Sequence, residues 1–61
     1  MNMKIIEITG CKIPYFWYEN RIGKFYAVTM ELPRSYYVKL KDRIDWVYKE
    51  DAKEVGEISE L

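Results

Sequence analysis

The alternation of hydrophobic and polar side chains along the chain predicts four β-strands, at residues 3–9, 24–32, 36–42 and 43–49. Successive side chains in a strand point to opposite faces of the sheet, so a strand with one buried face has hydrophobic residues at every second position. The positions expected to face the core are Ile6, Ile8, Tyr26, Val28, Met30, Tyr36, Val38, Leu40, Ile44, Trp46 and Tyr48. In the last of the four strands, Val47 is then expected to face solvent.

A run of four aromatic residues, YFWY at residues 15–18, lies between the first two strands. We interpret it as a short extended piece in which Phe16 and Tyr18 face inward, while Tyr15 and Trp17 face outward. The segment that follows contains asparagine and glycine, which suit turn or bulge conformations.

The chain changes character at KEDAKEV, residues 49–55. Lys, Glu and Ala favour helix, and Asp51 is of the type that caps a helix start, so we expect a single helical turn here. Residues 56–61 either add a last short strand, through Val55 and Ile58, or fray.

Four to five short antiparallel strands and one helical turn predict a single all-β domain over residues 1–61. We expect a small SH3-like barrel, because closing the sheet removes most exposed strand edges. An antiparallel meander capped by a C-terminal helix is the alternative. A domain of this size buries only about 60% of the surface of its unfolded chain. The 49% hydrophobic and 16% aromatic content therefore has to supply the core.

The chain has more aromatic side chains than such a domain can enclose, with two Trp, six Tyr and two Phe. The outward rings either shield each other across strands or form an interface, where Trp, Tyr and Arg dominate the binding energy. The candidate partner-binding residues are Tyr15, Trp17, Arg21, Lys24, Phe25 and Tyr37.

The net charge is zero, but the charges are unevenly distributed. Residues 1–41 carry seven Lys and Arg against three Glu, whereas residues 42–61 carry three Lys and Arg against seven Asp and Glu. The acidic end, from Asp42 to Glu60, is expected to meet a basic partner surface or a nucleic-acid-binding groove.

The residue types that catalysis needs are scarce in this chain. With no histidine and one cysteine, Cys11, it has neither a Ser–His or Cys–His pair nor the ligand set of a zinc site. Its three glycines are isolated, so it has no phosphate-binding loop. We expect a protein that is not an enzyme and that uses no cofactor, metal or small-molecule substrate.

The expected location is the cytoplasm. A single cysteine forms no intrachain disulfide, and the N-terminal stretch MNMKIIEITG does not have the pattern of a signal peptide. The longest apolar run is far shorter than a membrane span, so we expect no membrane contact.

The stretches NRIGKFYAV, SYYVKL and WVYKEDAKEV resemble small SH3-like barrel proteins over residues 20–58. Such barrels often enter a strand through a glycine, continue with a strand rich in Tyr and Val, and place an acidic helical turn before the last strand. The composition, rich in Ile, Lys, Glu and Tyr, also resembles short accessory proteins of phages and mobile elements in low-GC bacteria. Several of those bind a host protein, sometimes a defence protein. The chain lacks the ALYDY-like start of signalling SH3 domains, so the resemblance does not imply proline-peptide binding.

These observations favour a non-catalytic protein-interaction module of the phage or mobile-element type. Its partner is expected to be a host protein, which it modulates, or a second copy of itself in a homodimer. The alternative is a small β-barrel that binds single-stranded nucleic acid with the same rings, together with Lys24 and Lys39. The zero net charge and the acidic last third weigh against that alternative.

Overall fold

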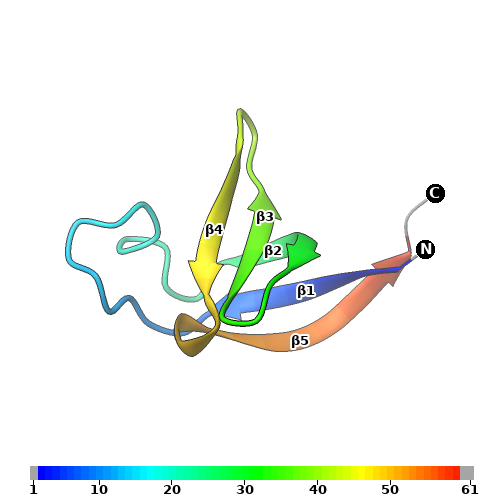
Figure 1. The fold of residues 1–61 in the computed structure, drawn as a ribbon, viewed down its shortest axis with the longest axis horizontal. Coiled ribbons are helices and arrows are strands. Elements are labelled where there is room, and N and C mark those ends of the chain that lie inside the picture. The colour runs from blue at the N-terminus through cyan, green and yellow to red at the C-terminus, as the bar shows by residue number, and fades with distance from the viewer. Residues whose placement is uncertain (1, 60–61) are drawn as a thin grey trace.

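The computed structural model describes residues 2–59, in which five strands and one short 3₁₀ turn are found (Figure 1). The elements are β1 (Asn2–Ile8), β2 (Phe25–Glu31), β3 (Ser35–Lys39), β4 (Ile44–Tyr48), the 3₁₀ turn (Lys49–Asp51) and β5 (Ala52–Ser59). The prediction of a small all-β domain with a late helical turn is confirmed.

The strands form an antiparallel sheet in the order β4-β3-β2-β1-β5. β2 pairs with β1 through its first residues and with β3 through its last, so it belongs to both halves of the sheet. Figure 1 shows the β3–β4 hairpin rising steeply from the ribbon that β1 and β5 form. Within the described residues no ladder joins the edge strands β4 and β5, and the sheet is open between them.

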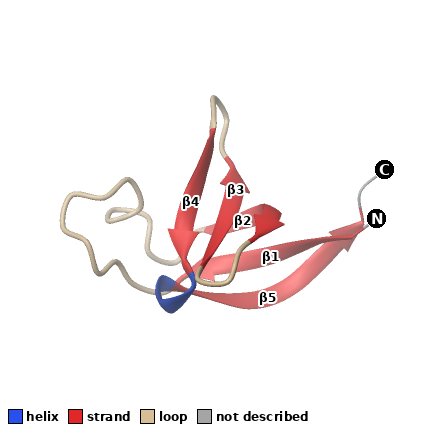
Figure 2. Cartoon of the chain, in the orientation of Figure 1, coloured by secondary structure: helices blue, strands red, loops and turns tan. Residues whose placement is uncertain are grey.

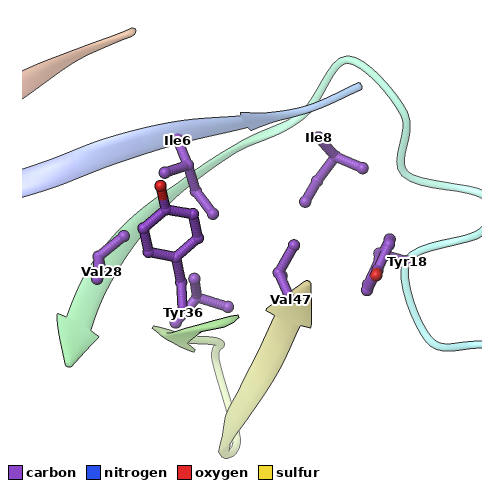
Figure 3. Close-up of a cluster of buried hydrophobic side chains, with 7 residues drawn as sticks. Ile6, Ile8, Tyr18, Val28, Tyr36 and Val47 are labelled. Carbon is purple, nitrogen blue, oxygen red and sulfur yellow. The ribbon is translucent and has the colours of Figure 1, made fainter. Parts of the chain in front are cut away.

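The core lies between the two halves of the sheet. Its buried hydrophobic side chains come from β1, β2, β3, β4 and the loop before β2, and they are Ile6, Ile8, Tyr18, Val28, Tyr36, Val38 and Val47 (Figure 3). The inward positions predicted for β1 and β3 are confirmed, with Leu40 partly buried against this cluster. Tyr26 is also only partly buried there.

The faces predicted for β4 are wrong. Val47 is fully buried opposite Tyr36, whereas Ile44 and Trp46 are 60% and 41% exposed and Tyr48 is half-buried. A strand has a side-chain period of two, so choosing the wrong alternate set exchanges both faces at once. The prediction placed the bulkier side chains inside, and the core here takes the smaller valine.

The inward position predicted for Met30 is also wrong, because this side chain is 54% exposed. Val28 lies opposite Val38, but Met30 lies opposite Tyr37, so β2 has one extra residue, Thr29, at this point. Such a β-bulge interrupts the alternation and turns the following side chain to the other face.

The helical turn is shorter than the predicted segment and ends at Asp51, which does not cap its start. Residues 52–59 form β5 instead, so the last strand expected near Val55 and Ile58 is present and begins earlier. The remainder of the predicted segment, residues 60–61, lies outside the described residues.

Candidate functional site

The loop between β1 and β2, residues 9–24, extends away from the strands at the end of the molecule opposite the described chain ends (Figure 2). It consists of successive turns, so the extended piece predicted for residues 15–18 is wrong. Backbone N–H groups of Glu19 and Arg21 donate to the carbonyls of Phe16 and Tyr18, at 3.0 Å each. Turns satisfy the backbone polar groups locally, which a lone extended segment away from a sheet would not do.

A buried hydrogen-bond cluster ties this loop to the 3₁₀ turn. The Tyr18 hydroxyl donates to Asp51 Oδ2 at 2.5 Å, and the backbone N–H of Lys12 donates to the same oxygen at 3.3 Å. The Tyr48 N–H donates to the Tyr18 hydroxyl oxygen at 3.4 Å. Burial, followed by the hydrogen bond to Asp51, raises the pKa of Tyr18 above its ordinary value, so the hydroxyl keeps the proton it donates. A buried carboxylate without these donors would be costly.

Trp17 lies against the body of the protein, so the prediction that it points outward is wrong. Its side chain is half-buried, and its indole N–H donates to the Trp46 carbonyl at 2.7 Å. The Arg21 guanidinium lies 5.6 Å from the centre of the Trp17 ring and donates to the Tyr26 hydroxyl at 3.3 Å. The Trp17 and Tyr26 rings meet edge to face at 5.5 Å. These contacts hold the guanidinium in one orientation.

Tyr15 is the most exposed of the large hydrophobic side chains that the structure describes, with 94% of its surface open. Its backbone has a φ of 65°, in the left-handed region that bulky residues rarely adopt. Its N–H donates to Glu19 Oε2 at 3.0 Å, which helps to hold this conformation.

A second group of rings covers the outer surface of β2, β3 and β4. Met30, Tyr37 and Trp46 lie directly opposite one another across the three strands, on the face that points away from the core. Tyr48 is on the same face of β4, and Phe16 from the loop packs within 6.3 Å of both Trp46 and Tyr48. We call this surface the aromatic face, and its members are Phe16, Met30, Tyr37, Trp46 and Tyr48.

The six predicted site residues do not form one surface. Trp17 and Arg21 lie together, and Tyr37 lies on the aromatic face instead. Phe25 is 58% exposed at the start of β2, opposite Glu7 of β1. The other two are exposed residues of the loop, Tyr15 and Lys24.

Trp46, Tyr48 and Met30 were not predicted as surface residues, because each was assigned to the core. The signal for β4 was present in the sequence: inverting its two faces places Trp46 outward with Tyr48 and leaves Val47 inside. The cross-strand position of Trp46 opposite Tyr37 depends on the hairpin register, which alternation within one strand does not specify.

The acidic residues of the C-terminal third are largely engaged within the chain. Their contacts are Asp42 and Asp45 with Arg43, Glu50 with Lys12, Asp51 with Tyr18, Glu54 with Lys4, and Glu57 with Asn2. Asp51 and Glu57 have neutral hydrogen-bond partners and keep their negative charge, and Asp42 and Asp45 share one arginine. The expected contact between this acidic end and a basic partner stays a prediction.

The central ion-pair group joins β1, β2 and the 3₁₀ turn. Glu31 accepts hydrogen bonds from Lys4 and, at 2.6 Å, from Lys49. The hydrogen bond from Lys4, followed by that from Lys49, lowers the pKa of Glu31 to about 2. Lys4 also contacts Glu54 of β5 at 2.9 Å, and its own pKa is raised above the ordinary value by both carboxylates.

No protein-family model, curated protein or solved structure matches this chain. Over residues 2–59, no group of three or more His, Cys, Asp or Glu side chains is arranged to hold a metal ion. The described residues also include no helix of the length and hydrophobicity that crossing a membrane requires.

Proposed function

We propose that this chain is a non-catalytic protein-interaction module, of the kind found among accessory proteins of phages and mobile elements, and that the aromatic face binds its partner. The observation that supports this most strongly is the row of Met30, Tyr37 and Trp46 across three strands, extended by two further rings. The outer face of a small antiparallel sheet is ordinarily polar. Here Met30 and Trp46 are 54% and 41% exposed, and Phe16, Tyr37 and Tyr48 are half-buried beside them. A hydrophobic cluster on an outer face is typical of an interface, where aromatic side chains supply most of the energy.

We also propose that the fold is an SH3-like barrel with an opening between β4 and β5. Three features support this assignment: the last strand pairs with the first, β2 is shared by both halves of the sheet, and an acidic 3₁₀ turn directly precedes β5. In such an arrangement the 3₁₀ turn spans the gap that a ladder would close. Residues of the loop and of β4 then border the same exposed surface.

The partner is a host protein or a second copy of this chain. In either case, one pair of variants tests whether the aromatic face is the surface that binds it. Trp46→Lys places a charge in the aromatic face, and Phe25→Lys makes the same change at an exposed ring outside it. Affinity capture from the natural host's lysate, with quantitative mass spectrometry, measures hetero-association. Light scattering over a range of concentrations measures self-association.

We expect Trp46→Lys to reduce partner recovery, or dimer content, by about tenfold or more, as loss of an interface hot spot does. Phe25→Lys should keep the partner recovery and the dimer content of the wild type. Far-UV circular dichroism should show that both variants are folded. Equal binding by the two variants would overturn the assignment of the aromatic face. A strict monomer that captures no protein would overturn the proposed function itself.

A further inference from the structure

A cavity of about 700 Å³ lies apart from the aromatic face, between the end of the long loop and the turn of the β3–β4 hairpin. Its charged lining consists of Arg21, Lys39, Lys41 and Arg43 with one carboxylate, Asp42. The Tyr26 side chain contributes an aromatic wall with a hydroxyl group. We call it the cationic pocket.

Three of the four cations that line this pocket have no ion-pair partner among the described residues. Arg43 pairs with Asp45 at 3.0 Å and approaches Asp42 at 3.9 Å. Among residues 2–59, no carboxylate lies within 4.0 Å of the cationic groups of Arg21, Lys39 or Lys41. Three cations at one opening repel each other in the free protein, and a bound anion relieves that repulsion.

The ion pairs elsewhere explain how a chain of zero net charge has such a site. Lys4, Lys12, Lys49 and Lys53 each contact a carboxylate from another part of the chain. These four lysines pair with Glu7, Glu31, Glu50 and Glu54 around β1, β5 and the 3₁₀ turn. Arg21, Lys39 and Lys41, at the hairpin end, have no such partner among residues 2–59. The zero net charge of the chain, which weighed against nucleic-acid binding, does not describe the local charge at the cationic pocket.

The guanidinium of Arg21 is held by two contacts within the chain. Its position over the Trp17 ring and its hydrogen bond to Tyr26 occupy one donor and leave the others available. A side chain fixed in this way loses less conformational entropy when it binds. Lys39 and Lys41 contribute two further point charges to the lining, and successive phosphates of one strand can contact both.

We propose that the cationic pocket binds the phosphate groups of single-stranded nucleic acid. Unpaired cations beside an aromatic ring, here Tyr26, form the combination that sequence-tolerant single-strand binding uses, with phosphates on the cations and a base against the ring. This site is separate from the aromatic face, so it adds a nucleic-acid ligand to a protein that binds another protein elsewhere.

The test is fluorescence anisotropy with a labelled oligothymidylate of about 12 nucleotides, a length within the usual single-strand site sizes. The double variant Lys39→Ala/Lys41→Ala removes two unpaired pocket cations. The control Lys12→Ala/Lys53→Ala makes the same change in net charge outside the pocket. Affinities are measured at several salt concentrations, because the dependence on salt reports the number of phosphates neutralised.

We expect the pocket variant to bind at least tenfold more weakly at low salt and to reduce the slope of log K against log salt by about 1.4, or about 0.7 for each lost contact. The control should change the affinity less than about threefold, since only the net charge differs. Trp46→Lys should bind the oligonucleotide like the wild type, which separates this site from the proposed protein interface.

Three outcomes would overturn the proposal. The first is no binding by the wild type at low salt, and the second is an equal loss in the pocket and control variants. The third is displacement of the oligonucleotide by polyglutamate as effectively as by polyphosphate, which would show a general anion surface.

Discussion

The loop of residues 9–24 contains no strand, and yet its Tyr18 is the largest of the fully buried side chains. β5 is the longest strand, and none of its residues, Ala52–Ser59, is buried. The loop is linked to the rest of the molecule by the Tyr18–Asp51 hydrogen bond and the Trp17–Tyr26 ring contact. β5 pairs with β1 along one edge and leaves its other edge open.

This difference between the loop and β5 shows that a segment can form regular backbone hydrogen bonds without contributing to the core, and can contribute to the core without forming them. A strand at the edge of a sheet has its backbone partly satisfied by its one neighbour, but it gains little from hydrophobic burial when its side chains stay exposed. A loop with one ring enclosed in the core gains that burial without any ladder. We therefore expect substitutions in the irregular loop to cost more stability than substitutions in the longest strand.

The largest effect is expected from Tyr18→Ala. Removing a buried ring costs about 3–5 kcal/mol, which is a large part of the roughly 3–9 kcal/mol that a domain of this size has. Tyr18→Phe keeps the ring but leaves Asp51 without its hydroxyl donor, at a cost of about 1–3 kcal/mol. Urea unfolding followed by fluorescence measures both. A cost below about 0.5 kcal/mol for Tyr18→Ala would mean that the loop is not part of the core.

The two opposite faces of β4 differ in the same way, one buried and one exposed. Val47→Ala removes a fully buried side chain and is expected to cost about 2 kcal/mol, whereas Ile44→Ala, at a position 60% exposed, should cost less than about 0.5 kcal/mol. The free energies of unfolding of the two variants, measured at equilibrium, show which face of β4 is buried. A larger cost for Ile44→Ala than for Val47→Ala would instead support the predicted orientation, with Ile44, Trp46 and Tyr48 facing the core.

In β5, Ile58→Ala is expected to change the free energy of unfolding by about 0.5 kcal/mol or less, because the side chain is 49% exposed on an edge strand. Thermal unfolding measures the change. A cost close to that of Val47→Ala would show that β5 packs as tightly as the inner strands, and the contrast with the loop would then fail.

The smallest effect concerns the ion pairs that Glu31 of β2 makes with Lys4 of β1 and Lys49 of the 3₁₀ turn. The pKa of Glu31 lies at about 2 against an ordinary value of 4.5, so its ion pairs stabilise the fold fully above pH 4.5, and that contribution is lost as the pH falls from 4.5 towards 2. A carbon-detected NMR titration should give a midpoint near 2, and Lys4→Met should move it towards 4.5. A wild-type midpoint at 4.5 would contradict these pairs.

Strand positions were largely predictable from the sequence, because alternation acts locally. Ile6 and Ile8 were placed correctly in β1, as were Tyr36 and Val38 in β3. The errors arose where a distant contact decides the outcome. In β4 the alternation is present, but alternation does not specify which of the two faces is buried, and Val47 faces the core opposite Tyr36.

The candidate sites were predictable only as residue types. A surplus of rings was evident, but which of them share a surface depends on the register of three strands and on the bulge at Thr29. The pairing of Tyr18 with Asp51, 33 positions apart, likewise has no local signal. The cationic pocket emerges only when the ion pairs of the folded chain are known.

Both proposed sites include residues of the loop, Phe16 in the aromatic face and Arg21 in the cationic pocket, so both need the loop to be fixed to the core. Residue-resolved amide hydrogen exchange tests this requirement most directly. We expect the amides of Glu19, Arg21 and Gly23 to exchange more than about tenfold more slowly than in an unfolded chain, an opening free energy above about 1.4 kcal/mol. Residues 57–59 of β5 should exchange faster than these. Loop amides that exchange at the unfolded rate, while β5 is protected, would contradict the claim that Tyr18 fixes the loop to the core.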